Sequence, residues 1–527
     1  MSKLILTGIE ARQKLKAGID KVASCVKITL GPKGKNVVLD RKYTTPLITN
    51  DGVTIAKEIE LDDPFENIGA NLIKEVSIKT NDSAGDGTTT ACVLASAIID
   101  EGLKNIASGA NPISLRKGID IAVNTVINEL KTISKPVSSD QEIAQVAAIS
   151  AGDQEIGNLI CDAFKKVGRD GVITIEESKT SQTNLRVVQG LEFDRGYISP
   201  YMVSQNSNIA TLENAYILVT DKKLTNLADL LPLFEKIMET RKPLLIIAED
   251  VDGEVLSTLA LNNIRGSFIS VAVKCPSFGE KQKEYLEDIC LLTGATFISN
   301  QLYSNLKDIS LEHLGEATKI KVTKDKTTIV GGAAKTEEIE FKREQLHEML
   351  SCELDTYDKV KIEDRLARLS GGVAIIEVGA PSEVEMKEKK LRIEDALSAT
   401  KAATQEGIVA GGGCALIMCE NKLNEIIENY DGDTQTGIKI IKKAIQAPLR
   451  QISKNSEQDD GVVVTNVQAK IKENIGFNAL KCTYENMYNA GIIDPTNVTR
   501  CAILNAGSVA STILTTEVIV AESPEKQ

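Results

Sequence analysis

The sequence predicts a multidomain α+β protein in which helical segments from both ends of the chain form one discontinuous domain. Three observations lead to this prediction. A chain of 527 residues is too long for a single hydrophobic core and is expected to form two to four domains. Its first 132 residues and the stretch 414–520 are predicted to be mainly helical. Between them, from about residue 190, strands and helices alternate, which is typical of an α/β unit.

Helical periodicity is strongest in the N-terminal part. Helices are predicted over 9–28, 65–80, 88–107 and 112–130, with a short strand at 37–39. In the second helix Phe65, Ile68, Leu72 and Val76 fall on one stripe. The fourth opens with Asn111-Pro112, a cap followed by a first-turn proline.

The middle of the chain begins with a loop near 134–140. A helical stretch and a strand at 171–175 follow. The α/β pattern then comprises strands at 216–219, 244–248 and 269–273, with helices at 226–240 and 253–265 between them. A charged helical stretch (336–369), a strand (373–378) and a helix (382–406) lead to the glycines that open the last helical region.

Composition excludes several function classes. The hydrophobic content of 42% and the charged content of 26% are ordinary for a globular protein, and no apolar run approaches the roughly 18 residues of a membrane span. A secretory signal is not expected. Ten scattered cysteines and two histidines lack the spacing of a zinc site or a catalytic Cys–His pair, so we expect reduced thiols and a cytoplasmic protein. The formal charge of −13 disfavours nucleic acid as a partner.

The most informative motif is Gly85-Asp86-Gly87, which is followed by three threonines, Thr88, Thr89 and Thr90. Glycine turns and helix N-termini present backbone N–H groups that bind phosphate. A carboxylate there would repel phosphate unless a divalent cation lay between them, which indicates Mg²⁺ held jointly with a nucleotide. A capped helix start with no ligand is the alternative interpretation of this motif alone.

Two other turns combine glycine with hydroxyl or acidic side chains, at 29–34 and at 49–54. None of the three is a Walker A sequence, and no dinucleotide fingerprint follows a strand. A nucleotide bound here would need a phosphate-binding loop of a different type from these two motifs.

Six separated segments stand out in the sequence: Leu30-Gly31-Pro32-Lys33-Gly34, Asn50-Asp51-Gly52-Val53-Thr54, Gly85-Asp86-Gly87-Thr88-Thr89-Thr90, Arg392-Ile393-Glu394-Asp395-Ala396-Leu397, Ala410-Gly411-Gly412-Gly413 and Asp494-Pro495-Thr496. In sequence and in order they resemble group I chaperonins, the sixty-kilodalton ring chaperones of bacteria, mitochondria and chloroplasts. The similarity runs from the first predicted helix to about Val520.

The resemblance implies chaperonin architecture with three domains. These are a mainly helical equatorial domain (1–132 and 407–527), a small intermediate domain (133–189 and 373–406) and an α/β apical domain (190–372). Hinges are expected at Gly190, Gly371, Gly372 and Gly407; simple turn glycines are the alternative.

The implied function is ATP-driven protein folding. The family captures non-native polypeptides on apical helices and encloses them in a ring cavity under a co-chaperonin lid. We therefore expect an ATPase that uses Mg²⁺, with K⁺ as a second candidate cation. The expected assembly is a homo-oligomer of two stacked seven-subunit rings.

The resemblance also assigns site residues. Asp86 would hold the metal, and Asp51 and Asp395 would act in catalysis. Nucleotide contacts are expected from Thr29, Leu30, Gly31, Pro32, Asn50, Asp86, Gly87, Thr88, Thr89, Thr90, Gly412, Asn478, Ala479, Leu480 and Asp494. From the helical pattern alone, Asp395 points away from the packing face of Ile393 and is a solvated surface charge. The family's matching aspartate aligns the hydrolytic water.

Substrate contacts are implied on the apical helices, where apolar residues exceed what one buried stripe requires. They are Tyr197, Tyr201, Met202, Leu231, Phe234, Leu256, Ala260 and Leu261. Without the resemblance, burial in a core is the alternative interpretation. Large exposed apolar patches mark interaction sites.

The sequence departs from the family pattern at several positions. Asn50 stands where a lysine is usual, Ala260 is smaller than usual and Met202 replaces an aromatic residue. The C-terminus lacks Gly-Gly-Met repeats. Three rivals stay open: an ATP-independent holdase or scaffold with a vestigial nucleotide site, a phosphotransferase, and a group II chaperonin with a built-in lid extension.

Overall fold

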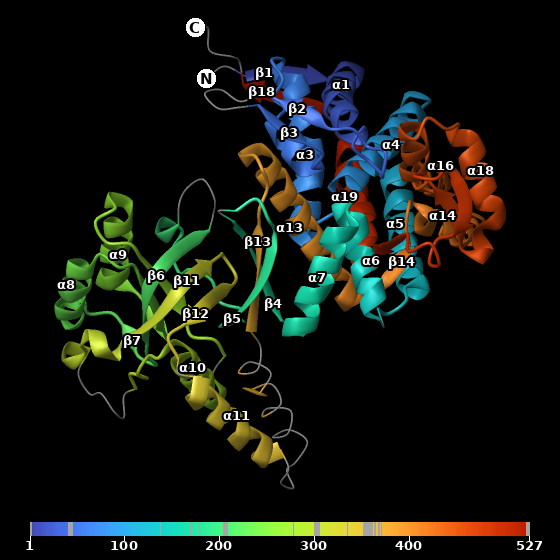
Figure 1. Ribbon diagram of the computed structural model, residues 1–527. Coiled ribbons are helices and arrows are strands. Elements are labelled where there is room, and N and C mark those ends of the chain that lie inside the picture. The colour runs from blue at the N-terminus through green and yellow to red at the C-terminus, as the bar shows by residue number, and fades with distance from the viewer. Residues whose placement is uncertain are drawn as a thin grey trace. The chain divides into compact units, whose positions relative to one another are not determined.

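The computed structural model describes residues 3–40, 46–137, 139–168, 171–178, 180–203, 209–277, 279–299, 306–334, 336–350, 362, 365–366, 369 and 372–522. The chain divides into two compact units, each described here by itself (Figure 1). Unit 1 comprises Met1–Asp162, Glu177–Thr183 and Val378–Gln527, and unit 2 comprises Ala163–Glu176 and Asn184–Glu377. Unit 1 is therefore discontinuous in sequence.

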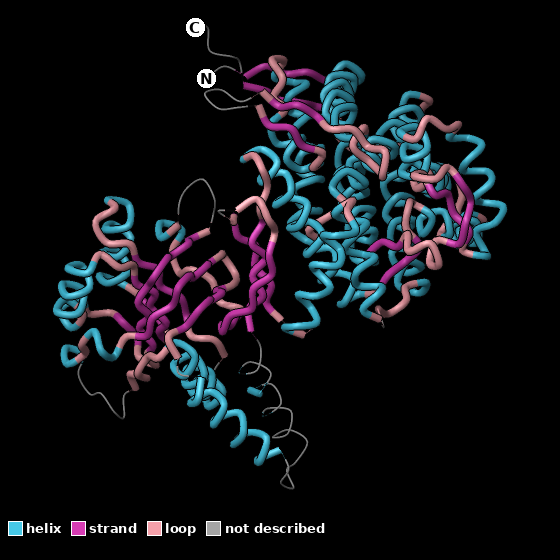
Figure 2. Tube along the Cα trace, in the orientation of Figure 1, coloured by secondary structure: helices cyan, strands magenta, loops and turns pink. Residues whose placement is uncertain are grey.

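Unit 1 consists mainly of helices, with short strand pairs (Figure 2). The helices are α1 (Gly8–Lys27), α2 (Gly52–Glu58), α3 (Pro64–Ala84), α4 (Thr88–Ala107), α5 (Pro112–Ile133), α6 (Asp140–Ala151), α13 (Glu383–Glu406), α14 (Cys414–Met418), α15 (Glu420–Ile427), α16 (Gly432–Ala444), α17 (Ala447–Asn455), α18 (Asp460–Lys470) and α19 (Thr496–Leu514). The antiparallel strand pairs are β1 (Lys3–Thr7) with β18 (Val518–Glu522), β2 (Val37–Leu39) with β3 (Leu47–Thr49), β14 (Ile408–Ala410) with β17 (Ile493–Pro495), and β15 (Ile475–Asn478) with β16 (Thr483–Asn486).

Helices α4 and α19 lie at the centre of the main core of unit 1. Both contribute many fully buried apolar residues to it, as expected for helices that are apolar on most sides. At Gly102 an added Cβ would lie 2.4 Å from a methyl carbon of Leu514, so glycine lets the two helices approach closely. This packing fixes α4, whose N-terminus carries the threonine motif.

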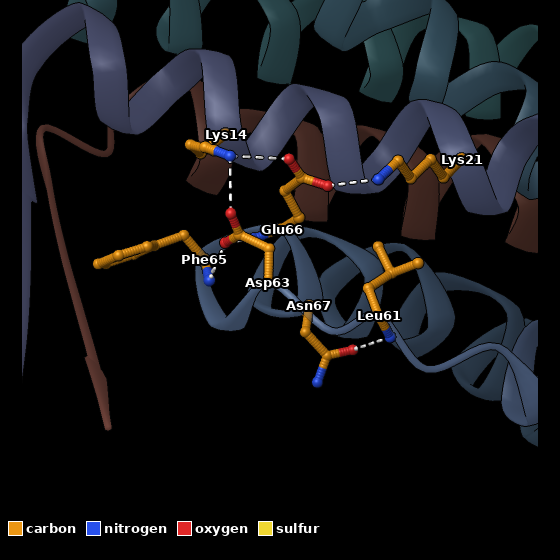
Figure 3. Close-up of polar contacts among 7 residues, drawn as sticks. All are labelled: Lys14, Lys21, Leu61, Asp63, Phe65, Glu66 and Asn67. Carbon is orange, nitrogen blue, oxygen red and sulfur yellow. Dashed lines mark hydrogen bonds and ion pairs between the residues drawn. The ribbon is translucent and has the colours of Figure 1, made fainter. Parts of the chain in front are cut away.

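Helix α3 is tied to α1 by a charged cluster at its N-terminus (Figure 3). Asp63 caps α3 by accepting a hydrogen bond from the backbone N–H of Phe65 at 2.9 Å. Lys14 bonds Asp63 at 2.6 Å and Glu66 at 2.9 Å, and Lys21 bonds Glu66 at 2.5 Å. The hydrogen bond from Lys14 lowers the pKa of Asp63, and those from Lys21 and Lys14 lower the pKa of Glu66. The cluster therefore fixes the position of one helix on the other.

Unit 2 is built on one mixed sheet. Its strands are β4 (Val172–Glu177), β5 (Asn184–Phe193), β6 (Ala210–Val219), β8 (Leu244–Ala248), β10 (Ser270–Lys274), β11 (Gly315–Val322), β12 (Thr327–Gly332) and β13 (Gly372–Val378), with β7 (Lys223–Leu224) and β9 (Asp250–Val251) forming a separate short pair. The helices are α8 (Leu231–Thr240), α9 (Gly253–Arg265), α10 (Glu280–Thr293) and α11 (Thr336–Leu350), and α7 (Gln154–Val167) begins in unit 1 and ends in unit 2.

The sheet order is β10-β8-β6-β11-β12-β5-β13-β4. Strands β10, β8 and β6 are parallel, and α8 and α9 lie in the connections between them. Strand β8 is buried along its whole length, as a central parallel strand should be. The predicted α/β alternation is confirmed for these three strands.

The secondary structure differs from the sequence prediction in several places. The helix predicted over 226–240 is broken: a 3₁₀ turn (Leu227–Asp229) precedes Leu230, and α8 starts only at Leu231 with proline in its first turn. The region 414–520 is not helical throughout, because it contains β15, β16, β17 and the start of β18. Strands β1, β3, β5, β7, β9, β11, β12 and β14 and helix α10 were not predicted. Helix α11 accounts for 336–350, and most of the predicted continuation to 369 lies outside the described residues.

The predicted hinge glycines occupy different settings. Gly190 lies inside β5, at the point where that strand changes partner from β13 to β12, so the alternative of a simple turn is wrong there. Gly372 begins β13, and Gly407 ends α13 with a φ of 81°. Gly371 lies outside the described residues. The hinge role itself stays a prediction.

Candidate functional site

The turn between α3 and α4 is shaped by two glycines. Gly85 (φ 70°) and Gly87 (φ 79°) both adopt the left-handed conformation that glycine tolerates best. No side chain caps α4, whereas Asp51, Asp63 and Asn111 cap α2, α3 and α5. Gly87 is the N-cap of α4 and offers no side-chain hydrogen bond, so the first N–H groups of α4 have no capping side chain as acceptor.

Asp86 lies in this turn and is held at both oxygens. Oδ1 accepts a hydrogen bond from the N–H of Gly87 at 2.5 Å, and Oδ2 accepts one from the hydroxyl of Ser150 on α6 at 2.7 Å. Burial raises the pKa of Asp86, and the charge of Asp51 raises it further, against the lowering effect of the two hydrogen bonds. The carboxyl is therefore fixed in place in an environment that disfavours additional negative charge.

Asp51 reaches the same region as the N-cap of α2. Its Oδ1 accepts from the N–H of Val53 at 3.1 Å, and its Oδ2 accepts from the N–H and the hydroxyl of Thr54 at 2.9 and 2.5 Å. At Gly52, an added Cβ would lie 2.4 Å from the hydroxyl oxygen of Thr89. This glycine therefore lets the start of α2 pack directly on the start of α4.

Asp395 joins the site from α13. At Gly85 an added Cβ would lie 2.2 Å from Cβ of Ser398, so the glycine turn packs directly against α13. Residues three apart share a helix face, which places Asp395 beside this contact. Burial raises the pKa of Asp395 well above its usual range, and the charges of Asp86 and Asp51 add to the effect. The pattern-based interpretation of Asp395 as a solvated surface charge is wrong, because this half-buried side chain faces other carboxyls.

Asp494 adds a fourth carboxyl on β17. Strand β14 pairs with β17, and the glycines that follow β14 pass beside Asp494. Burial raises the pKa of Asp494 to about 7, with a further contribution from the charge of Asp86, while a hydrogen bond from the N–H of Gly412 acts in the opposite direction. The predicted residues Gly412 and Asp494 are thus in direct contact.

The remaining predicted nucleotide residues lie in four segments, at 29–32, 50, 87–90 and 478–480. Thr29 is buried, and its hydroxyl lies 3.3 Å from that of Thr89. Asn478 is also buried and accepts a hydrogen bond from the N–H of Leu480 at 3.0 Å, which shapes the turn after β15. Ala479 is buried and Leu480 is exposed. Of the others, Gly31, Pro32 and Asn50 are exposed, Leu30, Gly87 and Thr90 are half-buried, and Thr88 is buried.

The donor set of this site suits Mg²⁺ held together with phosphate. In the described part of the chain, no group of three or more Asp, Glu, His or Cys side chains could hold a metal ion by itself. Mg²⁺ is usually bound by one or two carboxylates together with substrate phosphates. Carboxyls with raised pKa values in mutual range would be stabilised by a cation, so the residues present fit Mg²⁺.

The predicted substrate residues of unit 2 divide into exposed and buried groups. Leu231, Leu261 and Tyr201 are 44%, 46% and 65% exposed. Tyr197, Leu256 and Ala260 are half-buried. Met238 on α8 and Ile264 on α9 are exposed apolar residues that the sequence analysis did not assign to this surface. Both helices therefore combine a buried face with exposed apolar side chains.

Two substrate assignments are wrong. Phe234 is buried, and its ring packs against that of Phe268 with the centroids 5.5 Å apart. Met202 is also buried, and its sulfur accepts a hydrogen bond from the N–H of Ala272 at 3.3 Å. Both residues belong to the core of unit 2 and contribute no exposed surface.

Sequence reasoning also missed Ser150 and Ser398. Ser150 bonds Asp86 and Ser398 packs on Gly85, but neither has a local sequence signature that would indicate its contact. The position of a cavity does not identify the site either. A cavity of about 580 Å³ beside α15 and α16, lined by Lys442 among others, includes none of the predicted site residues. The site is identified by converging polar groups.

No helix in the described ranges is both long enough and apolar enough to cross a bilayer. The profile of the TCP-1/cpn60 chaperonin family matches residues 22–524. Among solved structures, the chain is similar to the chaperonin gp146 from the bacteriophage EL 2 (Pseudomonas aeruginosa), crystallised in the presence of ATP-BeFx. The two share 20% sequence identity with a TM-score of 0.71, over 99% of this chain and 100% of the other. The predicted multidomain α+β chaperonin architecture is thus confirmed, and the chain belongs to the TCP-1/cpn60 chaperonin family.

Proposed function

We propose that this protein is an ATP-driven chaperonin of the group I type, which couples ATP hydrolysis in unit 1 to the capture and release of non-native polypeptides on unit 2. One observation carries the proposal. Asp51, Asp86 and Asp395 come from three distant segments and lie within electrostatic range of one another, beside the uncapped start of α4. Such a cluster of acids is costly unless a cation and its ligand use it.

Asp86 and the threonines would bind the triphosphate. Asp86 would hold Mg²⁺, while the hydroxyl and N–H groups of Thr88, Thr89 and Thr90 would donate hydrogen bonds to phosphate oxygens. When bound, Mg²⁺ would neutralise phosphate charge during phosphoryl transfer; K⁺ is a second candidate cation. Ser150 keeps the Asp86 carboxyl oriented in the absence of ligand.

Of the two predicted catalytic residues, Asp395 is a better candidate than Asp51 to align the attacking water and accept its proton. A base with a raised pKa suits that task, and burial raises the pKa of Asp395. Both oxygens of Asp51 already accept hydrogen bonds within α2, so Asp51 would contribute mainly negative charge from a fixed position. The base and ribose would contact Gly412, Asn478, Ala479, Leu480 and Asp494.

The exposed apolar residues of α8 and α9 would bind non-native chains, because apolar surface of this kind marks interaction sites. The same surface would take a co-chaperonin lid. We propose a homo-oligomer of two stacked seven-subunit rings, with hinges at Gly190, Gly371, Gly372 and Gly407. The family match supports the ring, and the number of subunits stays a prediction. A cytoplasmic location also stays a prediction, supported by the free cysteines.

The decisive experiment is the refolding of an aggregation-prone enzyme with Mg·ATP, with and without a co-chaperonin. The variant Asp395→Ala should still bind ATP but lose turnover by about 100-fold or more, the usual size of a proton-transfer contribution. Glu385→Ala is the matched control, since this carboxylate on the same helix is exposed and its loss should leave turnover near wild type. Near-normal turnover in Asp395→Ala would remove the assignment. Capture that persists without any effect of ATP would instead favour the holdase.

A further inference from the structure

Lys33 and Cys482 meet at the edge of the candidate nucleotide site, although 449 residues separate them in sequence. The ammonium nitrogen of Lys33 lies 3.2 Å from the sulfur of Cys482. Lys33 follows the glycine turn at 29–31, and Cys482 lies in the turn between β15 and β16. Neither residue has a role in the proposed hydrolysis.

Cys482 differs from most other described cysteines in being accessible. It is half-buried, whereas seven of the others are buried and Cys25 is exposed. Burial raises the pKa of Cys414 to about 12, which keeps that thiol protonated and inert. Oxidation requires access and favours thiolates, which are stabilised by a neighbouring cation. Among the described cysteines only Cys482 combines partial exposure with a direct contact to an amine.

Both partners are attached to ordered backbone. The side chain of Asn455 donates hydrogen bonds to the carbonyls of Lys27 and Leu30 at 3.0 and 2.9 Å, which fixes the entry to the Lys33 loop. Cys482 has a φ of 56°, and its thiol also donates to the carbonyl of Ala479 at 3.6 Å. The amine and the sulfur are therefore held side by side by two anchored turns.

We propose that Lys33 and Cys482 form a modification site at which hydrogen peroxide joins the two side chains through a covalent S–N bond. In the first step the Cys482 sulfur attacks peroxide; the O–O bond breaks, an S–O bond forms, and water leaves, giving a sulfenic acid. The ammonium of Lys33 first releases one proton to solvent; its nitrogen then attacks sulfur, so that an S–N bond forms, the S–O bond breaks and the hydroxide leaves as a second water with another proton from the nitrogen. Sulfur is oxidised by two electrons, which reduce the peroxide.

The link would join the 29–34 loop to the hairpin that carries Asn478, Ala479 and Leu480. If the proposed function holds, both segments contact the nucleotide, and the link would slow nucleotide entry and release. A thiol reductant would restore both side chains by attack on sulfur, with release of the amine. The consequence for the nucleotide rests on the proposed function, whereas the link itself does not.

The test is peptide mass analysis of the full-length protein after treatment with hydrogen peroxide, with dimedone present to trap sulfenic acid. The wild type should yield a Lys33–Cys482 peptide pair lighter by two hydrogens, and dithiothreitol should abolish it. Lys33→Arg keeps the cation but has no amine that can lose its proton; the pair should vanish and the dimedone adduct of Cys482 should rise. Cys25 is the internal control, and it should give the dimedone adduct in every sample.

Failure of the link is recognised by a dimedone adduct at Cys482 that is equally abundant in the wild type and in Lys33→Arg, or by the absence of any reaction there. A second measurement follows nucleotide dissociation before and after oxidation, with Cys482→Ser as the unreactive control. Slower dissociation in the oxidised wild type alone is expected. If the peptide pair forms but the reduced protein binds no nucleotide, the site stands and the proposed function fails.

Discussion

Replacement of Asp494 by asparagine tests the electrostatics of the site without disturbing its shape. The carboxyl accepts a hydrogen bond from the N–H of Gly412, and its pKa is raised to about 7 by burial and by the charge of Asp86. An asparagine can accept the same hydrogen bond through its carbonyl oxygen. It carries no charge, so the variant removes the cost of ionising this group.

The expected change in the free energy of unfolding follows from the linkage between proton binding and folding. The pKa rises from the ordinary 3.8 to about 7, a shift of about three pH units that corresponds to at most ~4 kcal/mol. Because the folded state holds this proton more tightly than the unfolded state, its contribution to stability is present below about pH 4 and is lost as pH rises towards 7. Above that the wild type carries the full cost of a buried charge. Asp494→Asn should therefore raise the free energy of unfolding at pH 8 and leave it nearly unchanged at low pH.

The assay is urea unfolding of nucleotide-free protein at several pH values, followed by far-UV circular dichroism because the chain has no tryptophan. Asp431→Asn, a change at an exposed aspartate, controls for the loss of one negative charge. The difference will include relief of Asp86, which interacts with Asp494. Equal pH dependence in the wild type and Asp494→Asn, or a less stable variant at pH 8, would refute the reasoning.

Two further predictions concern the apolar surface and the glycine turn. Leu231→Ser combined with Leu261→Ser should abolish capture of an unfolded protein, measured by suppression of its aggregation, and leave basal ATPase intact. Ile113→Ser, at another exposed apolar residue, is the control, and undiminished capture by the double variant would place the binding surface elsewhere. Gly85→Ala should lower both stability and ATP affinity, because its Cβ would collide with α13. Gly152 is the control, because it has a similar positive φ but an added Cβ there would have no neighbour within 4 Å. Gly152→Ala should therefore cost only the backbone strain of about 1 kcal/mol or more. Equal losses of stability in the two variants would exclude the close contact between Gly85 and α13.

The sequence predicted the fold best where periodicity is strong. The helix expected over 88–107 is α4, with the same bounds, because a long apolar pattern with a glycine turn at its start has one reasonable interpretation. Strand β11 was missed because Ile320 and Val322 are the only large apolar residues among its eight, too few to make the alternation with Lys319 and Lys321 recognisable. Strands β15 and β16 have four residues each, too few for periodicity to appear.

The candidate site was predicted from motifs but not in its geometry. Asp51 and Asp86 lie in recognisable glycine turns, so they could be named. The position of Asp395 depends on the packing of Gly85 against Ser398, a contact between distant segments that no local pattern contains. Phe234 was assigned to the surface from the resemblance, whereas the buried face of α8 consists of Leu233, Phe234 and Ile237.

The central claim is that the carboxyl cluster around Asp86 binds a triphosphate through Mg²⁺. Isothermal titration calorimetry of the wild type and Asp86→Asn with ATP, with Mg²⁺ and with EDTA, tests it most directly. The wild type should bind Mg·ATP more tightly than metal-free ATP. Asp86→Asn should lose this preference and bind metal-free ATP better than the wild type, because one repelling charge is gone. Binding that is absent in all samples, or that is the same with and without Mg²⁺ in both proteins, would contradict the account.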